Sequence, residues 1–244
     1  MLQRQEEQDI SAMQFESGSE TSATQSPTAS SRTATSQSDE KQSDETVEHL
    51  FLEGADESRA DTYRILSRLF RAAPDADLLQ RLAECGNDEA PESKLTLAWN
   101  DLAGASRGAN PVVLDHEFHA MFIGLGRGEV LPYASWYLSG FLLDKPLARL
   151  REDLARLGID RAEDVTESED HFAALCETMA LLVAPEDGID LSGQKHFFDR
   201  HIQPWFGHFL ADVQAAKSVD YYRPVARLAQ AFFEFEQRWL SLPQ

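Results

Sequence analysis

The apolar residues of this chain recur at helical spacing along most of its length. In the clearest stretch they stand at i, i+3, i+4, i+7, i+10 and i+11, namely Phe172, Leu175, Cys176, Met179, Leu182 and Val183. This spacing places all six side chains on one face of an α-helix. The sequence shows no sustained alternation of apolar and polar residues, which is the pattern of a half-buried β-strand. It therefore predicts an all-α protein.

Three further apolar stripes indicate where other helices lie. They are Tyr63, Leu66, Leu69 and Phe70; Leu147, Leu150, Leu154 and Leu157; and Val225, Leu228, Phe232, Phe235 and Trp239. Gly158 follows the second stripe where a C-terminal cap belongs, and Pro224 opens the third at a first-turn position. Phe197, Phe198, Trp205 and Phe209 are expected to pack in the interior. We expect one domain of about eight to ten helices over residues 51–244.

Residues 1–50 differ from the rest in composition. They are rich in Ser, Thr, Gln and Glu and hold few large apolar side chains, so they cannot bury enough surface to offset the entropy of ordering. Three basic residues stand there against ten acidic ones, a net charge of -7 within a total of -20. We expect a disordered acidic tail, followed by a domain that is acidic in its own right.

The charge and hydropathy of the chain exclude several classes of function. A net charge of -20 and a pI near 4.6 disfavour binding to nucleic acids or to anionic membranes. They suit a basic partner such as an arginine-containing peptide, although solubility alone also explains them. The sequence has no run of 18 apolar residues and no apolar core of a secretory signal, so we expect a cytoplasmic protein without stable membrane insertion. Cys85 and Cys176 are too far apart to suggest a disulfide framework or a zinc site.

No catalytic or metal-binding motif can be assembled from the sequence. His116-Glu117-Phe118-His119 has its histidines at i and i+3, whereas the zinc-protease motif requires i and i+4. The sequence also has no Gly-x-Ser-x-Gly motif. We therefore expect no catalytic residue, no metal site and no cofactor.

The glycine-rich stretch Gly124-Leu-Gly-Arg-Gly128 has two interpretations. Such a loop can cradle phosphate groups, but neither a preceding strand nor the Gly-Lys-Ser/Thr ending of a nucleotide-binding loop is present. It can also be a turn that ends a helix and needs glycine for positive φ angles. We favour the turn and keep nucleotide binding as an alternative.

Two further segments combine residue types that suit recognition of a peptide. Tyr133, Trp136 and Tyr137 cluster just after the glycine turn, where aromatic rings with polar tips suit either a half-buried groove or the core side of the next helix. Thr166 with Glu169 has the spacing of a capping box, which predicts a helix starting there with Asp170 in its first turn. The local structural role competes with a binding role for Asp170 and for the adjacent His171.

The ordered set of motifs resembles the TorD/DmsD/NarJ family of redox-enzyme maturation chaperones. The set comprises Glu117-Phe-x-x-Met-Phe122 leading into Gly124 and Gly126, Pro132-Tyr-x-Ser-x-Tyr137, Glu169-Asp170-His171, and Gln194-x-x-Phe197-x-x-x-His201-x-x-Pro204-Trp205. The resemblance extends from about residue 58 to about residue 240. One position departs from the family, which often has proline two residues before the aspartate, where this chain has Ser168.

The resemblance implies an all-helical protein that is not an enzyme. Members bind the twin-arginine signal peptide, and often the body, of a molybdenum- or tungsten-cofactor oxidoreductase, and delay its export until the cofactor is inserted. The peptide-binding residues carried over are Tyr133, Ser135, Trp136, Tyr137, Asp170 and His171. We expect a carboxylate to pair with the peptide's guanidinium groups, so that charge reversal at Asp170 weakens binding without unfolding the domain.

The resemblance is compatible with more than one client and more than one assembly. The client can be a relative of formate dehydrogenase, dimethyl sulfoxide reductase or nitrate reductase, of which we favour the first. The protein can be a monomer or a domain-swapped dimer. A helical adaptor that binds a folded partner without recognising a leader is the second alternative.

Overall fold

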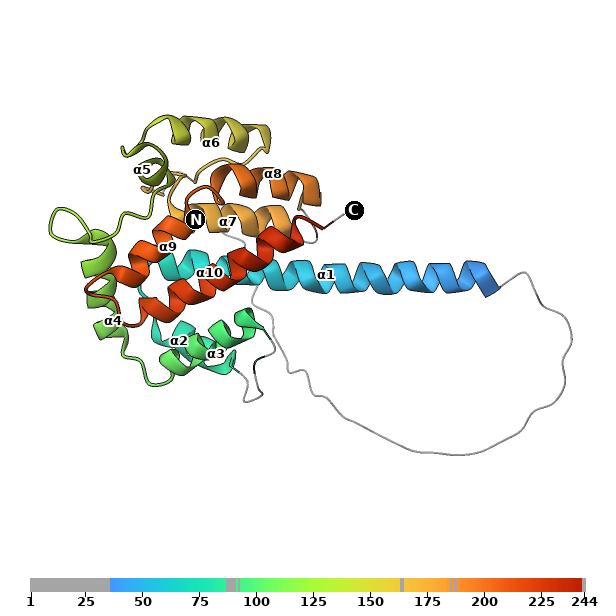
Figure 1. Ribbon diagram of the computed structural model, residues 1–244, viewed down its shortest axis with the longest axis horizontal. Helices are drawn as coiled ribbons and strands as arrows, with labels where there is room; N and C mark the ends of the chain where they lie inside the picture. Colours follow the sequence, from blue (N-terminus) through green and yellow to red (C-terminus); the bar gives the residue numbers. More distant parts are fainter. Residues whose placement is uncertain are drawn as a thin grey trace, which may run out of the picture. The chain divides into compact units, whose positions relative to one another are not determined.

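The structure is a computed structural model that describes residues 36–86, 91, 93–162, 165–184, 186 and 188–242, with side chains from Gly54 onward. These residues form ten α-helices, one π-helical turn and no strand (Figure 1). The all-α class and the expected number of helices are confirmed. The elements are α1 (Ser36–Arg71), α2 (Ala76–Glu84), α3 (Lys94–Ser106), α4 (Pro111–Phe118), η1 (His119–Ile123), α5 (Ala134–Ser139), α6 (Lys145–Arg156), α7 (Phe172–Val183), α8 (Leu191–His201), α9 (Phe206–Ala215) and α10 (Tyr222–Trp239).

The chain divides into two units, Met1–Phe51 and Leu52–Gln244. Of the predicted tail over residues 1–50, the first 35 residues lie outside the described part of the chain, and the backbone from Ser36 belongs to α1. The disorder of this tail stays a prediction. All side-chain contacts described below lie within the second unit.

The centre of the second unit is a cluster of aromatic rings from α1, α7 and α9. Phe172 packs against Phe70 with ring centroids 4.7 Å apart and against Phe209 at 4.6 Å. Tyr63 meets Phe232 of α10 edge-on at 4.8 Å. Full burial of each such side chain contributes about 1.5–3 kcal/mol. The rings predicted to be interior, Phe197, Phe198, Trp205 and Phe209, are all buried, as is Cys176.

A buried ion pair joins α1 to the last helix. Arg59 donates to Glu236 from Nε at 2.7 Å and from Nη2 at 2.9 Å, and also contacts Gln194 of α8 at 3.0 Å. The hydroxyl of Tyr63 donates to the same Glu236 carboxylate at 2.9 Å. Each of these side chains is at most 3 % exposed. The network fixes the position of α1 relative to α8 and α10.

Helix ends follow the expected chemistry at two positions. Gly158 has φ of +69° after α6, and the N–H of Ile159 donates to the carbonyl of Leu154 at 3.0 Å, which closes a Schellman-type cap. Pro224 lies in the first turn of α10. The start of α10 is also capped by the buried carboxylate of Glu117, which accepts hydrogen bonds from three successive backbone amides at 2.8–3.1 Å, those of Asp220, Tyr221 and Tyr222.

No helix within the described part of the chain combines the length and the apolar character needed to cross a bilayer.

Candidate functional site

The two segments singled out in the sequence are joined in the structure by a short antiparallel pairing. Tyr133 and His171 form an isolated β-bridge. The N–H of Ala134 donates to the carbonyl of Asp170 at 2.9 Å, and the N–H of Phe172 donates to the carbonyl of Pro132 at 2.8 Å. We call this pairing of residues 132–135 with 170–172 the seam. Phe172 also lies at the centre of the core, so it attaches the seam to the interior of the domain.

Asp170 has a structural role at the seam. Its carbonyl and its carboxylate Oδ2 accept the first two amides of α5, those of Ala134 and Ser135, each at 2.9 Å. The hydroxyl of Ser168 donates to Oδ1, and Asp170 is only 1 % exposed. Asp170 therefore caps α5 from another segment of the chain. A lysine at this position would bury a positive charge against the N–H groups of these amides, so we expect charge reversal at Asp170 to destabilise the fold as well as to affect binding.

The helix after the seam begins later than the sequence indicated. We expected a capping box of Thr166 and Glu169, but α7 starts at Phe172 and its N-cap is His171. Asp170 is engaged with α5, and the carboxylate of Glu169 accepts two hydrogen bonds from Arg151 at 2.9–3.0 Å. Neither acid is then available to begin a helix at residue 166. Ser168, the departure from the family pattern, holds the Asp170 carboxylate in place.

His171 is neutral and buried. Its Nδ1 accepts a hydrogen bond from the N–H of Ala173 at 3.1 Å, which requires that nitrogen to be unprotonated. Burial lowers the pKa of His171 from 6.5 to about 4. Its ring meets Tyr133 edge-on at 5.0 Å. At neutral pH His171 is therefore an uncharged residue that caps α7 and packs against Tyr133.

Ser135 organises the loop that follows α5. It is fully buried, and its Oγ accepts a hydrogen bond from the N–H of Leu143 at 3.2 Å. Leu143 has φ of +61°, the left-handed region that non-glycine residues rarely occupy. Ser135 therefore supports the backbone around the site and offers no free surface to a ligand.

The three aromatic residues of the first segment are half-buried, as expected for a recognition surface. Tyr137 stacks on Trp205 at 5.5 Å and donates a hydrogen bond to Asp212 at 2.9 Å. Burial, together with the hydrogen bond to Asp212, raises the pKa of Tyr137 well above its ordinary value. Burial raises the pKa of Tyr133 as well, with the nearby carboxylate of Glu167 adding to the shift. The phenol of Tyr137 thus contacts an exposed carboxylate, and the phenol of Tyr133 feels the charge of another, that of Glu167.

Trp136 connects this segment to the glycine turn. The guanidinium of Arg127 lies over the indole ring at 4.6 Å from its centroid. Gly124 ends η1 with φ of +62°, and Gly126 has φ of +95°. A Cβ atom on Gly124 would come within 2.1 Å of the carbonyl oxygen of Arg127. The interpretation of residues 124–128 as a helix-terminating turn is confirmed.

A cleft of about 510 Å³ lies beside the seam, between α5, α6 and the end of α8. Its apolar lining consists of Ala134, Leu138, Pro146, Leu150 and Pro204. Its polar lining consists of Arg149, Asp170, Arg200 and His201. His171, one residue from Asp170, lines a separate hollow of about 30 Å³ with Glu167. Asp170 and His171 are neighbours in extended backbone, and their side chains therefore point to opposite sides of the seam.

Asp153 of α6 binds two side chains that line the cleft, His201 and Arg200, and we call this group the Asp153 hub. The carboxylate of Asp153 accepts a hydrogen bond from Nε2 of His201 at 2.8 Å and pairs with Nε of Arg200 at 3.0 Å and with Arg156. Burial opposes ionisation, but the His201 hydrogen bond and the arginine charges outweigh it and keep the pKa of Asp153 below its ordinary value. Burial lowers the pKa of His201, so this histidine donates as a neutral ring.

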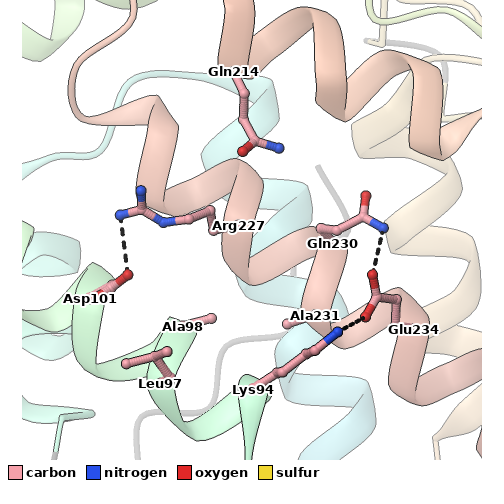
Figure 2. A pocket seen from close by; sticks show the side chains of 9 residues that line it. All are labelled: Lys94, Leu97, Ala98, Asp101, Gln214, Arg227, Gln230, Ala231 and Glu234. Atoms are coloured by element: carbon pink, nitrogen blue, oxygen red, sulfur yellow. Dashed lines mark hydrogen bonds and ion pairs between the residues drawn. The ribbon is translucent and has the colours of Figure 1, made fainter.

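A second hollow lies between α3 and α10 and measures about 250 Å³ (Figure 2). Its charged side chains pair with one another, Arg227 with Asp101 at 3.1 Å and Lys94 with Glu234 at 3.4 Å. These pairs satisfy the charges that would otherwise attract a ligand. The cleft at the seam is therefore the stronger candidate for a binding site.

Several residues of this cleft were missed by sequence reasoning. Arg149, Arg200 and Asp153 were not singled out in the sequence, although Arg200 lies within the family motif that runs from Gln194 to Trp205. One signal was present, because residues 145–156 hold four Lys or Arg against two acids in a chain with 22 basic and 42 acidic residues. That local excess of positive charge marks the helix as different from the rest of the molecule.

Known proteins match the chain across this region. The family model described as "Nitrate reductase delta subunit" matches residues 88–211, half of the chain, and includes the seam and the cleft. Chaperone protein TorD of Vibrio cholerae is 28 % identical over 207 residues, covering 76 % of this chain and 93 % of the relative. Chaperone protein TorD of Shewanella pealeana is 23 % identical, covering 76 % and 91 %.

Among solved structures, a redox enzyme maturation protein from Archaeoglobus fulgidus is similar, with a TM-score of 0.48 and 19 % identity, covering 73 % of this chain and 93 % of that one. The named relatives are chaperones rather than enzymes. On the strength of the family match, this chain belongs to the nitrate reductase delta subunit family, the TorD/NarJ family of redox-enzyme maturation chaperones.

Proposed function

We propose that this protein is a cytoplasmic chaperone for a molybdenum- or tungsten-cofactor oxidoreductase. It binds the twin-arginine signal peptide and the apo form of that enzyme and delays export until the cofactor is inserted. The observation that carries the proposal is the seam, because it brings the two family segments together beside a cleft. A formate dehydrogenase-like subunit is the first client to test.

The aromatic side of the seam suits the leader peptide. Tyr133, Trp136 and Tyr137 are half-buried and offer ring surface to an apolar segment at little entropic cost. The exposed carboxylate of Asp212 accepts a hydrogen bond from Tyr137, and the exposed carboxylate of Glu167 acts electrostatically on Tyr133. Carboxylates bind guanidinium groups through charge-assisted, often bidentate, hydrogen bonds. We therefore assign the two arginines of the leader to Glu167 and Asp212. Asp170, Ser135 and His171 hold the backbone of this surface in place.

Titration calorimetry tests this proposal. The titrant is the twin-arginine leader of the molybdoenzyme encoded nearest to the gene. We expect wild-type protein to bind with micromolar or tighter affinity. The double variant Glu167→Gln/Asp212→Asn should bind at least about tenfold more weakly, which corresponds to about 1.4 kcal/mol.

The matched control is Glu57→Gln/Glu84→Gln, which removes the same two negative charges from exposed positions on α1 and α2. It should bind as wild type does. Equal binding by all three proteins would refute the assignment of the arginine pair. Absence of binding by wild type to both the leader and the apo enzyme would refute the chaperone proposal itself.

A further inference from the structure

The lining of the cleft beside the seam holds more basic than acidic side chains, unlike the chain as a whole. The chain carries a net charge of -20, yet two arginines, Arg149 and Arg200, line the cleft together with one acid, Asp170. The nearby acids are already engaged, Asp170 with the amides of α5 and Asp153 with Arg156, Arg200 and His201. A concave surface of one charge sign concentrates ligands of the opposite sign.

The two arginines are prepared for a ligand in different ways. The Nε atom of Arg200 is held by Asp153 at 3.0 Å, which fixes the direction of its guanidinium group at the cleft. Arg149 is exposed, and its guanidinium has no hydrogen-bond or ion-pair partner among the described residues. The guanidinium group of Arg200 is thus pre-oriented, and that of Arg149 is free to contact a ligand. Guanidinium groups match the geometry of carboxylate and phosphate oxygens.

An exposed apolar loop joins two residues of the cleft lining, Leu138 and Pro146. Leu138 lines the cleft, and the loop that follows α5 exposes Phe141, Leu142 and Leu143, with Phe141 71 % exposed. The hydrogen bond from the N–H of Leu143 to Ser135 holds this loop in its unusual backbone conformation. Exposed apolar residues next to a cleft are typical of surfaces that bind a polypeptide.

We infer that the cleft binds an acidic group of the client, a carboxylate within an apolar segment of its mature body, through Arg149 and Arg200. Glu167 and Asp212, to which we assign the arginine pair of the leader, do not line this cleft. This inference rests on the proposed chaperone function and divides its site into two halves with opposite charge preferences. Two guanidinium groups of a leader would be repelled by the arginines of the cleft.

Reversal of the charge at Arg149 tests the inference. Wild-type protein and Arg149→Glu are titrated with the apo client subunit expressed without its leader. We expect Arg149→Glu to bind about tenfold more weakly or worse, because a second carboxylate then faces the client's own. Because Arg149 has no hydrogen-bond or ion-pair partner among the residues that the structure describes, this change should leave the thermal unfolding midpoint unaltered. Unchanged or tighter binding would overturn the inference.

Arg81→Glu is the matched control. Arg81 lies on α2, outside the cleft, is also exposed, and has no ion pair among the described residues. It changes the total charge by the same amount and should bind the subunit as wild type does. A loss equal to that of Arg149→Glu would show a general charge effect and would also overturn the inference.

A second arm does not depend on the client, so its result separates failure of the inference from failure of the proposed function. The full-length protein is titrated with inorganic pyrophosphate while the arginine Nε–H signals are followed by NMR. Saturable shifts of the Arg149 and Arg200 signals, assigned with Arg149→Gln and Arg200→Gln, are expected even if no client binds. If these signals did not shift, the assignment of the cleft as a binding site for carboxylate or phosphate oxygens would be overturned.

Discussion

The carboxylate of Asp170 caps a helix that begins 36 residues earlier in the chain, with Oδ2 accepting the N–H of Ser135 at 2.9 Å. The backbone of the same residue accepts the preceding amide, that of Ala134. A short helix such as α5 gains little stability from its own hydrogen bonds and depends on contacts of this kind. The position of the aromatic segment at the seam therefore depends on Asp170.

Removal of the Asp170 carboxylate should destabilise the fold. We expect Asp170→Ala to lower the free energy of unfolding by about 1–3 kcal/mol, because the amide of Ser135 is left buried without an acceptor. Asp170→Asn keeps an acceptor oxygen and should lose less. Urea denaturation measures both. An unfolding midpoint for Asp170→Ala equal to that of wild type would contradict the capping role.

The buried His171 should make stability fall as the pH is lowered. The unfolded chain takes up a proton near pH 6.5, whereas the folded protein resists protonation until about pH 4. The unfolded state therefore binds more protons between these values, and stability is lost from about pH 6.5 down to about pH 4, at no more than about 1.4 kcal/mol per pH unit from this residue.

His171→Asn is the variant that isolates this effect. Asparagine can accept the same capping hydrogen bond but does not titrate. Urea unfolding of both proteins at several pH values should give a shallower pH dependence for the variant in that window. Parallel curves would show that His171 does not cause the loss.

The Arg59–Glu236 pair should be costly to break from one side. Glu236→Gln leaves the charge of Arg59 in the interior without its main partner, and we expect a loss of about 3–5 kcal/mol in the free energy of unfolding. The control is Glu234→Gln on the same helix, which removes a partly exposed pair with Lys94 and should cost less than about 1 kcal/mol. Similar unfolding midpoints for the two variants would contradict the role given to the network.

Two glycines should respond to alanine in opposite directions. Gly124→Ala places a Cβ atom 2.1 Å from the carbonyl oxygen of Arg127 at a φ of +62°, so we expect it to destabilise the protein by more than about 1 kcal/mol. Gly104, inside α3, has no atom within 4 Å of an added Cβ, and alanine there should stabilise by about 0.5–1 kcal/mol. Thermal unfolding of both variants checks the pair, and equal shifts would count against the turn geometry.

The helices were predictable because their signal is local. The stripe from Phe172 to Val183 and the cap at Gly158 both appear in the structure as expected. The seam was not predictable in the same way, since the pairing of Tyr133 with His171 depends on how helices pack across 38 residues of sequence. Thr166 and Glu169 had the spacing of a capping box, but tertiary contacts to α5 and Arg151 determined the structure of that segment.

The candidate site was predictable only in part. Family resemblance pointed to residues 133–137 and 170–171, and the structure brings these together, but the buried Ser135 and Asp170 support the site and the exposed Glu167 and Asp212 lie at its surface. The arginines of the cleft belong to two helices far apart in the sequence. No spacing rule connects Arg149 with Arg200, so only the folded structure could place them together.

The most direct test of the chaperone account is a photo-crosslink from the seam to the precursor of the client enzyme. A photoreactive phenylalanine analogue replaces Tyr133 in the full chain, and a second protein carries it at Arg81 as the control. The account predicts a crosslink from position 133 to the leader of the apo precursor and none from position 81. Crosslinks to the precursor from position 81 alone, or none from either position, would contradict it.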